Sequence, residues 1–389
     1  MSSLLVAGGT LLTPFEMIED GAVLERDGVI VRVGPRSALA GERAGVTLDA
    51  GGRLICPGFI DLQVNGGGGA LLTDVPTVET VERMARDWVR TGTTSLLPTA
   101  VTANEANMAA ALAAVHEAMQ RPRSGARVLG AHLEGPFINP VRKGAHDERF
   151  IRQPDAKLFD RLLAAAQGAL RLITLAPELP GGLELLAAAR AASAAVSIGH
   201  TDATYDEALR AIEAGAAMGT HLYNGMRPFA QREPGVIGAL LASDAITAGL
   251  SADSVHVHPA ALALAYKAKG PDRVALVTDA LWSAGEGVGA EELQGRGVSL
   301  HDGAWYLRDG TLAGSALSMN VAVRNMHRLA GLPLIDCVRM ATATPARVLG
   351  LDGEIGALTP GAKADIVVCD DELRVWKVFV GGELAYDGA

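Results

Sequence analysis

The chain has 389 residues, of which 34 are basic and 44 acidic, and its formal net charge is −10. A negative balance argues against a nonspecific polyanion-binding surface, and no basic run or aromatic-interleaved patch points to nucleic acid as a partner. A phosphorylated small molecule remains compatible with this balance, because one pocket can be locally positive in an acidic protein. The length suits an α/β barrel, which takes about 250 residues, together with a smaller domain.

The three cysteines, Cys56, Cys337 and Cys369, are widely spaced and form no Cys-x-x-Cys pair. This pattern predicts neither a disulfide framework nor a cysteine-based zinc site. The N-terminus has no basic start followed by a long apolar core, and Arg190 interrupts the alanine-rich stretch before Ile198. We therefore expect a cytoplasmic protein that is neither secreted nor inserted in a membrane.

Residues 1–56 have the pattern of short strands separated by turns, and residues 346–389 repeat that character. Between them, over residues 57–345, apolar strand-like runs alternate with helical stretches rich in alanine and leucine. We place such helices at residues 81–91, 105–121, 155–169 and 205–214. Alternation of this kind is typical of a parallel sheet with crossover helices. The prediction is an α/β protein: a (β/α)8 TIM-like barrel at 57–345 and a small β-sandwich domain formed jointly by the two terminal segments.

Eight candidate barrel strands end near Val64, Thr99, Leu133, Ala176, Gly199, Thr220, Ser251 and Thr278. Catalytic groups of such barrels lie at the carboxyl ends of different strands, so residues far apart in sequence converge on one pocket. Glu134, His200 and His221 follow three of these ends, and zinc accepts carboxylate oxygen and imidazole nitrogen as ligands. Three protein ligands leave a position for water in a catalytic site. Asp279, after the eighth strand, is then the candidate to take a proton from water and return it to a leaving amine.

A single histidine or aspartate at a strand end is more often a surface or core residue than a functional one. Repetition at four corresponding strand ends favours a site. Glu178, which follows Ala176-Pro177, either lines the pocket or lies exposed on a loop. His132 shares a strand face with Glu134, and it either supports the metal or packs as a hydrogen-bonded core residue.

Short motifs occur in one order along nearly the whole chain. They are Pro-Gly-Phe-Ile-Asp at 57–61, His-Leu-Glu-Gly-Pro at 132–136, Lys-Gly-Ala-His at 143–146, Gly-His-Thr at 199–201, His-Leu-Tyr-Asn at 221–224, Arg-Glu-Pro-Gly at 232–235, Val-Thr-Asp-Ala at 277–280 and Leu-Ala-Gly-Ser at 312–315. Together they resemble the amidohydrolase superfamily and, within it, the N-acetylglucosamine-6-phosphate deacetylase family. The motifs at 132–136 and 221–224 are jointly specific to that family, whereas the first identifies only the superfamily.

The resemblance implies that one divalent metal ion, expected to be Zn²⁺, is bound by Glu134, His200 and His221, and that Asp279 is the catalytic acid and base. It also implies that His146 is catalytic, because a donor near the acetyl carbonyl would stabilise charge that develops on oxygen. The implied substrate-binding positions are His146, Asn224, Gly225, Arg232, His256 and Ala313. In the family the arginine reaches across from a second subunit, so the resemblance implies a homodimer in which Arg232 crosses the interface.

The implied activity is hydrolysis of the acetamide of N-acetyl-D-glucosamine 6-phosphate to D-glucosamine 6-phosphate and acetate, in amino-sugar catabolism or cell-wall sugar recycling. The alternative is another superfamily hydrolase that acts on a related phosphate, such as N-acetylgalactosamine 6-phosphate, or on a cyclic amide. No residue in the sequence distinguishes the two amino sugars. A non-catalytic barrel is disfavoured, because the chain keeps the complete set of ligands and the general base.

The chain departs from the family pattern in two places. Gln63-Val64-Asn65 stands where most amidohydrolases have His-x-His after the first strand, and neutral amides bind a transition metal poorly. One metal ion rather than two is therefore expected. Ser254 stands where the family usually has glycine, and His258 would point the same way as His256 in a strand, so His258 is an alternative to His256 at the substrate.

Overall fold

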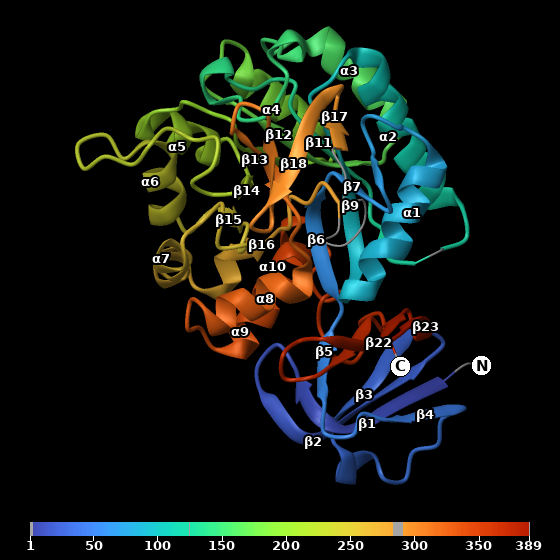
Figure 1. Ribbon diagram of the computed structural model, residues 1–389. Helices are drawn as coiled ribbons and strands as arrows, with labels where there is room; N and C mark the ends of the chain where they lie inside the picture. Colours follow the sequence, from blue (N-terminus) through green and yellow to red (C-terminus); the bar gives the residue numbers. More distant parts are fainter. Residues whose placement is uncertain (1–2, 124, 283–290, 389) are drawn as a thin grey trace.

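The computed structural model describes residues 3–123, 125–282 and 291–388. Residues 283–290, which fall inside the predicted barrel range, lie outside the described residues. Figure 1 shows two parts: a barrel of strands surrounded by helices, and below it a sheet built from both ends of the chain.

The barrel consists of parallel strands that alternate with helices. Its strands are β6 (Phe59–Val64), β9 (Thr93–Val101), β11 (Ala131–Glu134), β12 (Leu170–Leu175), β13 (Ala195–Ile198), β14 (Met218–Gly219), β15 (Thr247–Leu250) and β16 (Val274–Leu276). The helices that follow them in turn are α1 (Val78–Trp88), α2 (Glu105–Gln120), α3 (Ala156–Ala166), α4 (Gly182–Ala191), α5 (Tyr205–Glu213), α6 (Gly235–Ala242), α7 (Pro259–Lys269) and α8 (Met319–Arg328). The predicted barrel is confirmed, and each predicted strand end lies within two residues of an observed one.

Side-chain caps set the starts of several helices. Thr77, Asn104, Asp155 and Thr204 each accept a hydrogen bond from a backbone N–H in the first turn of α1, α2, α3 and α5. A cap of this kind satisfies a donor that has no partner within the helix. The first helix therefore begins at Val78, just after its cap Thr77, and not at the predicted residue 81.

The ring of strands closes between the first strand and the segment that follows the eighth. Val64 forms a parallel bridge with Ala280. On either side of that bridge the Asp279 N–H donates to the Gln63 carbonyl and the Asn65 N–H donates to the Ala280 carbonyl, both at 2.9 Å. This seam places Gln63, Asn65 and Asp279 side by side at the carboxyl ends of the strands.

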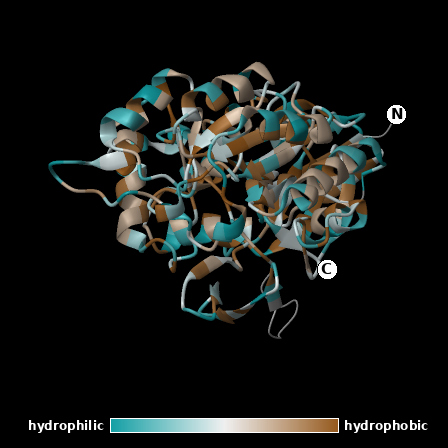
Figure 2. Ribbon diagram, turned by 90° about the horizontal axis from the view of Figure 1, so that it is seen from above, coloured by the Kyte–Doolittle hydropathy of each residue, from teal (hydrophilic) through white to brown (hydrophobic). Residues whose placement is uncertain are grey.

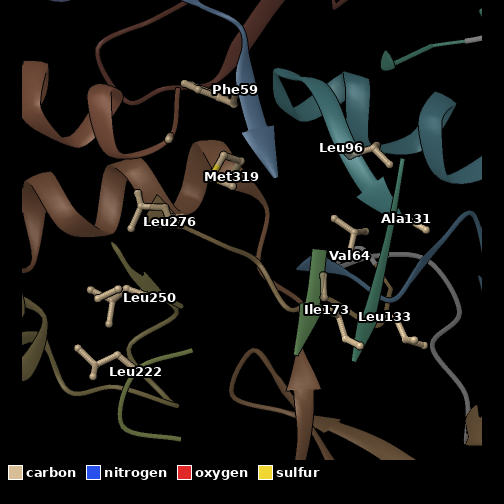
Figure 3. Packing of buried hydrophobic residues seen from close by; sticks show 14 of the residues in the cluster. Phe59, Val64, Leu96, Ala131, Leu133, Ile173, Leu222, Leu250, Leu276 and Met319 are labelled. Atoms are coloured by element: carbon tan, nitrogen blue, oxygen red, sulfur yellow. The ribbon is translucent and has the colours of Figure 1, made fainter. Parts of the chain in front are cut away.

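Apolar packing holds the strands from both sides. Alternate strand residues such as Leu62, Leu172 and Val277 form a cluster inside the ring. Their neighbours, such as Val64 and Leu133, pack with apolar residues of the helices in a second cluster, part of which is drawn in Figure 3. Seen from above in Figure 2, apolar residues gather on the central strands and polar residues on the outer turns. Because apolar burial contributes about 25 cal/mol per Å², this framework keeps the strand ends in fixed positions.

The two ends of the chain share one eight-stranded sheet. Its strands are β1 (Ser3–Leu12), β2 (Met17–Arg26), β3 (Val29–Pro35), β4 (Val46–Asp49), β5 (Leu54–Pro57), β21 (Ile366–Cys369), β22 (Val375–Val380) and β23 (Glu383–Asp387). β21 pairs antiparallel with β5, and β5 pairs parallel with β1. The first barrel strand, β6, then runs away from this sheet, so the carboxyl ends of the barrel strands lie on the far side (Figure 1).

A four-stranded antiparallel sheet, which the sequence analysis did not predict, joins the eighth barrel strand to α8. It comprises β17 (Glu291–Leu293), β18 (Arg296–His301), β19 (Ala304–Leu307) and β20 (Leu312–Ser315). Its first two turns are tight, with φ of 54° and 72° at Gln294 and Gly295 and of 50° and 86° at Asp302 and Gly303. Positive φ at both central residues is the backbone of a type I′ hairpin turn.

The remaining elements are short. They are β7 (Gly66–Gly67), β8 (Ala70–Leu71), β10 (Arg127–Val128), α9 (Leu334–Met340), α10 (Ala343–Val348) and five 3-10 turns at Arg36–Leu39, Val89–Thr91, Pro140–Arg142, Glu148–Phe150 and Pro271–Arg273. Within the described residues, no helix combines the length and the apolar character needed to cross a bilayer.

Candidate active site

Three side chains meet at the carboxyl ends of β11, β13 and β14. The Nε2 atoms of His200 and His221 lie 3.1 Å apart, and Glu134 Oε1 lies 3.3 Å from the first and 3.2 Å from the second. All three side chains are buried. The structure thus brings together the three residues predicted as metal ligands.

Backbone carbonyls decide which ring nitrogen of each histidine faces the site. His200 Nδ1 donates to the Arg142 carbonyl at 2.9 Å, and His221 Nδ1 donates to the Asn224 carbonyl at 3.1 Å. A carbonyl only accepts, so in a neutral ring the proton lies on Nδ1 and the lone pair on Nε2. Two imidazole lone pairs and a carboxylate oxygen then converge, and this donor set fits a divalent cation such as zinc.

The electrostatics of the cluster favour positive charge. Burial acts to raise the pKa of Glu134, but hydrogen bonds from His200 and His221 outweigh it and hold the pKa well below its usual value. Burial acts to lower the pKa of His221, yet the hydrogen bond and charge of Glu134 raise it to about 9. One carboxylate therefore attracts a cation or a proton to the same place.

Three site residues have backbone conformations that side chains seldom adopt. φ is 47° at His200, 29° at His221 and 52° at Asp279, each just past the end of a strand. Histidine and aspartate tolerate the left-handed region better than most residues, but such conformations still cost about 1–3 kcal/mol. The left-handed conformation at the end of each strand directs the side chain into the pocket.

Two amides occupy the seam beside this cluster. Gln63 Nε2 donates to Glu134 Oε1 at 2.9 Å and to Asp279 Oδ1 at 3.1 Å, while Asn65 Nδ2 donates to Asp279 Oδ1 at 2.8 Å. Burial, followed by the charge of Glu134, raises the pKa of Asp279, and the hydrogen bond from Asn65 opposes that rise. Asp279 is thus a carboxylate whose position is held by donors and whose basicity is increased by its surroundings.

A cavity of about 230 Å³ opens above these residues. It is lined by Glu134, His146, His200, His221, Asn224, Gly225, His256, Asp279 and Ala313, which are all of the predicted site residues except Arg232. His146 Nε2 lies 3.2 Å from His200 Nε2. Burial, followed by the nearby His200, lowers the pKa of His146 to about 3, so its ring is neutral near pH 7.

Arg232 lies away from the cavity of its own chain. It is exposed on the connection between β14 and α6, which projects from the body of the molecule in Figures 1 and 2. We call residues 227–234 the projecting loop. Reciprocal backbone hydrogen bonds between Ala230 and Glu233 form its tip, and the apolar Phe229 is 58% exposed there.

Four neighbouring positions can now be assigned. Glu178 neither lines the cavity nor stands free: it accepts hydrogen bonds from Asn139, Thr201 and Asp202. His132 packs as a hydrogen-bonded core residue, with Thr99 at 3.3 Å and Thr174 at 2.8 Å.

Residues 253–258 do not form a strand. His258 is exposed, and it caps α7 by accepting the Ala260 N–H. Ser254 has a φ of 69°, a conformation for which glycine is better suited.

His256 is held by the residue three positions before it. Its Nδ1 lies 2.5 Å from Asp253 Oδ2, and its backbone N–H donates to Asp253 Oδ1 at 2.8 Å. Burial acts to raise the pKa of Asp253, but the hydrogen bond and charge of His256, together with the backbone N–H donors of Val255 and His256, lower it. An aspartate on Nδ1 leaves Nε2 of His256 as the ring atom available to the cavity.

Sequence reasoning missed the turn between β17 and β18, which lies over the cavity. Gln294 donates from its backbone N–H to Asp74 and from its side chain to the Thr102 carbonyl, and Arg296 donates to the Ala145 carbonyl at 2.7 Å. Of the described residues that line the cavity, Arg296 is the one lysine or arginine. The Asp302-Gly303 pair was a usable signal, since Asp-Gly between alternating residues predicts a hairpin.

Comparison with known proteins agrees with this arrangement. The model of the amidohydrolase family matches residues 54–385, so the chain belongs to the amidohydrolase family. Its relatives place it among the N-acetylglucosamine-6-phosphate deacetylases of that family. It is 36% identical to N-acetylglucosamine-6-phosphate deacetylase of Bacillus subtilis strain 168, covering 99% of this chain and 97% of the relative. It is also 39% identical to N-acetylgalactosamine-6-phosphate deacetylase of Escherichia coli O157:H7, covering 96% and 97%.

Solved structures extend the likeness to the fold. N-acetylglucosamine-6-phosphate deacetylase from Pasteurella multocida superimposes with a TM-score of 0.92 at 32% identity, covering 98% of this chain and 99% of that one. A variant of the Mycobacterium smegmatis deacetylase in complex with N-acetyl-D-glucosamine 6-phosphate also gives 0.92, at 33% identity and covering 99% and 100%.

Proposed function

We propose that this protein hydrolyses the acetamide of N-acetyl-D-glucosamine 6-phosphate to D-glucosamine 6-phosphate and acetate. The observation that carries the proposal is the convergence of Glu134, His200 and His221 beside Asp279 in one cavity. The names of the relatives favour an acyclic acetamide over a cyclic amide.

Glu134, His200 and His221 would hold one divalent cation, which we propose to be Zn²⁺. When bound, this ion would supply Lewis-acid polarisation of the acetyl carbonyl and make a nearby water molecule more acidic. Gln63 and Asn65, which stand where most amidohydrolases carry His-x-His, direct amide N–H groups at the carboxylates of Glu134 and Asp279. A second transition-metal ion has no suitable ligands there, so we propose one ion per subunit.

Asp279 acts as the base and then as the acid. It accepts a proton from the water molecule that attacks the acetyl carbon, and its raised pKa supports proton uptake. The same proton passes to the sugar nitrogen as the carbon–nitrogen bond breaks, which leaves acetate and a free amine. Neutral His146 has one N–H to donate toward the carbonyl oxygen, where negative charge develops.

The phosphorylated sugar is proposed to extend from this centre toward Asn224, Gly225, His256 and Ala313, which line the same cavity. Clamping a remote phosphate allows binding energy to align the acetyl group with the reacting residues. An arginine offers a planar fork of donors that suits a phosphate.

Arg232 is proposed to supply that fork to the site of a second subunit in a homodimer. Its exposure on the projecting loop, away from its own cavity, supports this role. A mixture of Arg232→Gln and Asp279→Asn chains tests it, because a mixed dimer regains one intact site only when the arginine acts across the interface. Recovery of activity on mixing is expected. Two inactive variants that stay inactive in a verified mixed dimer would refute the exchange.

The test of the function itself is acetate release by one purified preparation of known metal content. N-acetylglucosamine 6-phosphate is compared with unphosphorylated N-acetylglucosamine and with N-acetylgalactosamine 6-phosphate, the substrate in the name of the relative from Escherichia coli O157:H7. We expect acetate release from N-acetylglucosamine 6-phosphate at about one metal ion per chain. Failure on all three sugars with full metal content would refute the proposal, and preference for N-acetylgalactosamine 6-phosphate would change the substrate.

We also infer a cytoplasmic location. The three cysteines are buried free thiols, which suits a reducing compartment.

A further inference from the structure

Asp202, two residues after the metal-ligand candidate His200, joins two arginines from different loops. Its Oδ1 accepts from Arg142 Nε at 2.7 Å, and its Oδ2 accepts from Arg227 Nη2 at 2.8 Å. Arg142 belongs to the loop after β11, and Arg227 is the first residue of the projecting loop. The side chain of Asp202 is 24% exposed, so this arrangement is sheltered from solvent without being fully buried.

Arg142 contacts both Asp202 and His200, through different groups. The carbonyl of Arg142 accepts the Nδ1 hydrogen of His200 at 2.9 Å, so the same arginine touches Asp202 with its side chain and His200 with its backbone. If Arg142 moves, the carbonyl that selects the Nδ1 tautomer moves with it. Groups that orient a metal-binding histidine in this way influence metal affinity without touching the ion.

The bond to Arg227 fixes the base of the projecting loop. Besides the bond to Oδ2, Arg227 Nε donates to the Asp202 backbone carbonyl at 2.7 Å. The Arg227 N–H donates to the Thr201 carbonyl at 3.1 Å, so three bonds attach this residue to the segment that follows His200. The tip of the loop carries Arg232, five residues further on.

Glu178 holds Asp202 in turn. Its Oε1 accepts the Asp202 N–H at 2.7 Å and Asn139 Nδ2 at 2.9 Å, and its Oε2 accepts Thr201 Oγ1 at 2.5 Å. Asn139 lies on the same loop as Arg142, and its N–H donates to the His200 carbonyl at 2.8 Å. Both loops are therefore attached to the segment that carries Asp202, and a movement of its carboxylate is transmitted to each.

We propose that Asp202 is a positioning residue that links the metal-binding histidine His200 to the loop that carries Arg232. One carboxylate keeps the Arg142 carbonyl on His200 Nδ1 and keeps Arg227 at the base of the projecting loop. The half of this inference that concerns the substrate rests on the proposed activity, and the half that concerns the metal rests only on the proposed ion site. The simpler view is a partly exposed ion pair with little effect on the site, since many such pairs contribute little.

Three variants separate the connection toward His200 from the connection toward the projecting loop. Arg142→Gln removes the side-chain bond that ties Arg142 to Asp202 and keeps the carbonyl that faces His200. Arg227→Gln removes the side-chain bonds at the base of the loop, and Asp202→Asn weakens the bonds to both arginines while keeping the shape of the side chain. The matched control is Arg161→Gln, which breaks an arginine–carboxylate pair with Glu105 between α2 and α3, away from the site. Zn²⁺ affinity is measured by competition with a chelator, and the visible spectrum of the Co²⁺-substituted protein reports ligand geometry. KM is measured for N-acetylglucosamine 6-phosphate.

We expect Arg142→Gln to weaken Zn²⁺ binding by roughly 10–100-fold and to change the Co²⁺ spectrum. Arg227→Gln should leave Zn²⁺ affinity as in the wild type and raise KM for the phosphorylated sugar. Asp202→Asn should show both effects, and Arg161→Gln should show neither.

Wild-type Zn²⁺ affinity and wild-type KM in Asp202→Asn would overturn the proposal. Equal losses of affinity in Arg142→Gln and Arg227→Gln, accompanied by a lower unfolding midpoint of the metal-free protein, would also overturn it, because they indicate a purely structural role. Failure of the proposed function is recognisable separately: the wild type would then release no acetate, while the order of the Zn²⁺ affinities would still decide the metal half.

Discussion

The cavity has two sides that differ in the groups they bring together. One side collects lone pairs, and the other side pairs a carboxylate with N–H donors. On the metal side, the lone pairs of Glu134, His200 and His221 face one another within 3.3 Å. On the amide side, Asp279 meets N–H donors from Gln63 and Asn65 at 3.1 and 2.8 Å. The first arrangement attracts a cation or a proton, whereas in the second the Asp279 carboxylate already accepts two amide hydrogen bonds. The strand ends of one barrel thus place three possible metal ligands beside a carboxylate that is held by amide donors.

The largest effect is expected from a change on the metal side. Glu134→Gln keeps the shape of the side chain but removes the negative charge that attracts the ion. We expect Zn²⁺ affinity to fall by more than the roughly 10–100-fold that changes behind the ligands cause, and activity to fall with it. Metal analysis after dialysis against a chelator measures this. Retention of a full equivalent of metal would show that the two histidines suffice.

The corresponding change on the amide side should act on the chemical step alone. Asp279→Asn leaves a group that cannot take up a proton, so kcat should fall by about 10²–10⁴-fold. Metal content should remain at one ion per chain, because Asp279 is not among the three converging ligands. Loss of metal from this variant equal to that from Glu134→Gln would erase the distinction between the two sides.

A smaller effect tests whether the amide of Asn65 lowers the pKa of Asp279. The hydrogen bond from Asn65 lowers the pKa of Asp279, so Asn65→Leu should raise that pKa further. Because the proposed mechanism requires the unprotonated carboxylate of Asp279, the acid limb of the kcat/KM profile should move to higher pH. A profile with an unchanged acid limb would show that Asn65 only fills space.

The last change concerns the residue beneath the amide side, and its effect is expected on stability and not on the chemical step. Asp61 is fully buried, and burial raises its pKa from 3.8 to about 7 despite the hydrogen bond from Thr278. A carboxyl group whose pKa is higher in the folded state stabilises the fold when protonated, and this stabilisation is lost as pH rises from about 4 to about 7. Asp61→Asn cannot ionise, so its deficit in unfolding free energy relative to the wild type should shrink over that range. Urea titrations at several pH values measure this difference in unfolding free energy. A difference that grows with pH would contradict the raised pKa of Asp61.

Much of the fold and of the site could be predicted because both follow from local rules. Barrel strands appear as apolar runs, and the groups after them appear as an abrupt change to imidazole or carboxylate, as at His200 and Asp279. The turn at Gln294 was missed because it belongs to an antiparallel insertion inside an alternating pattern. His258 was a reasonable competitor for His256 only under the assumption of a strand, and the bends at residues 253–257 remove that assumption.

The sequence by itself determined the barrel, the strand ends and the residues that meet there, because hydrophobic periodicity and strand order act along the chain. It could not determine which nitrogen of His200 faces the site, since that depends on the Arg142 carbonyl from another loop. Nor could it reveal that Asp202 holds two arginines or that Arg232 stands away from its own cavity. Those features are contacts between loops distant in sequence, and only the tertiary structure brings such loops together.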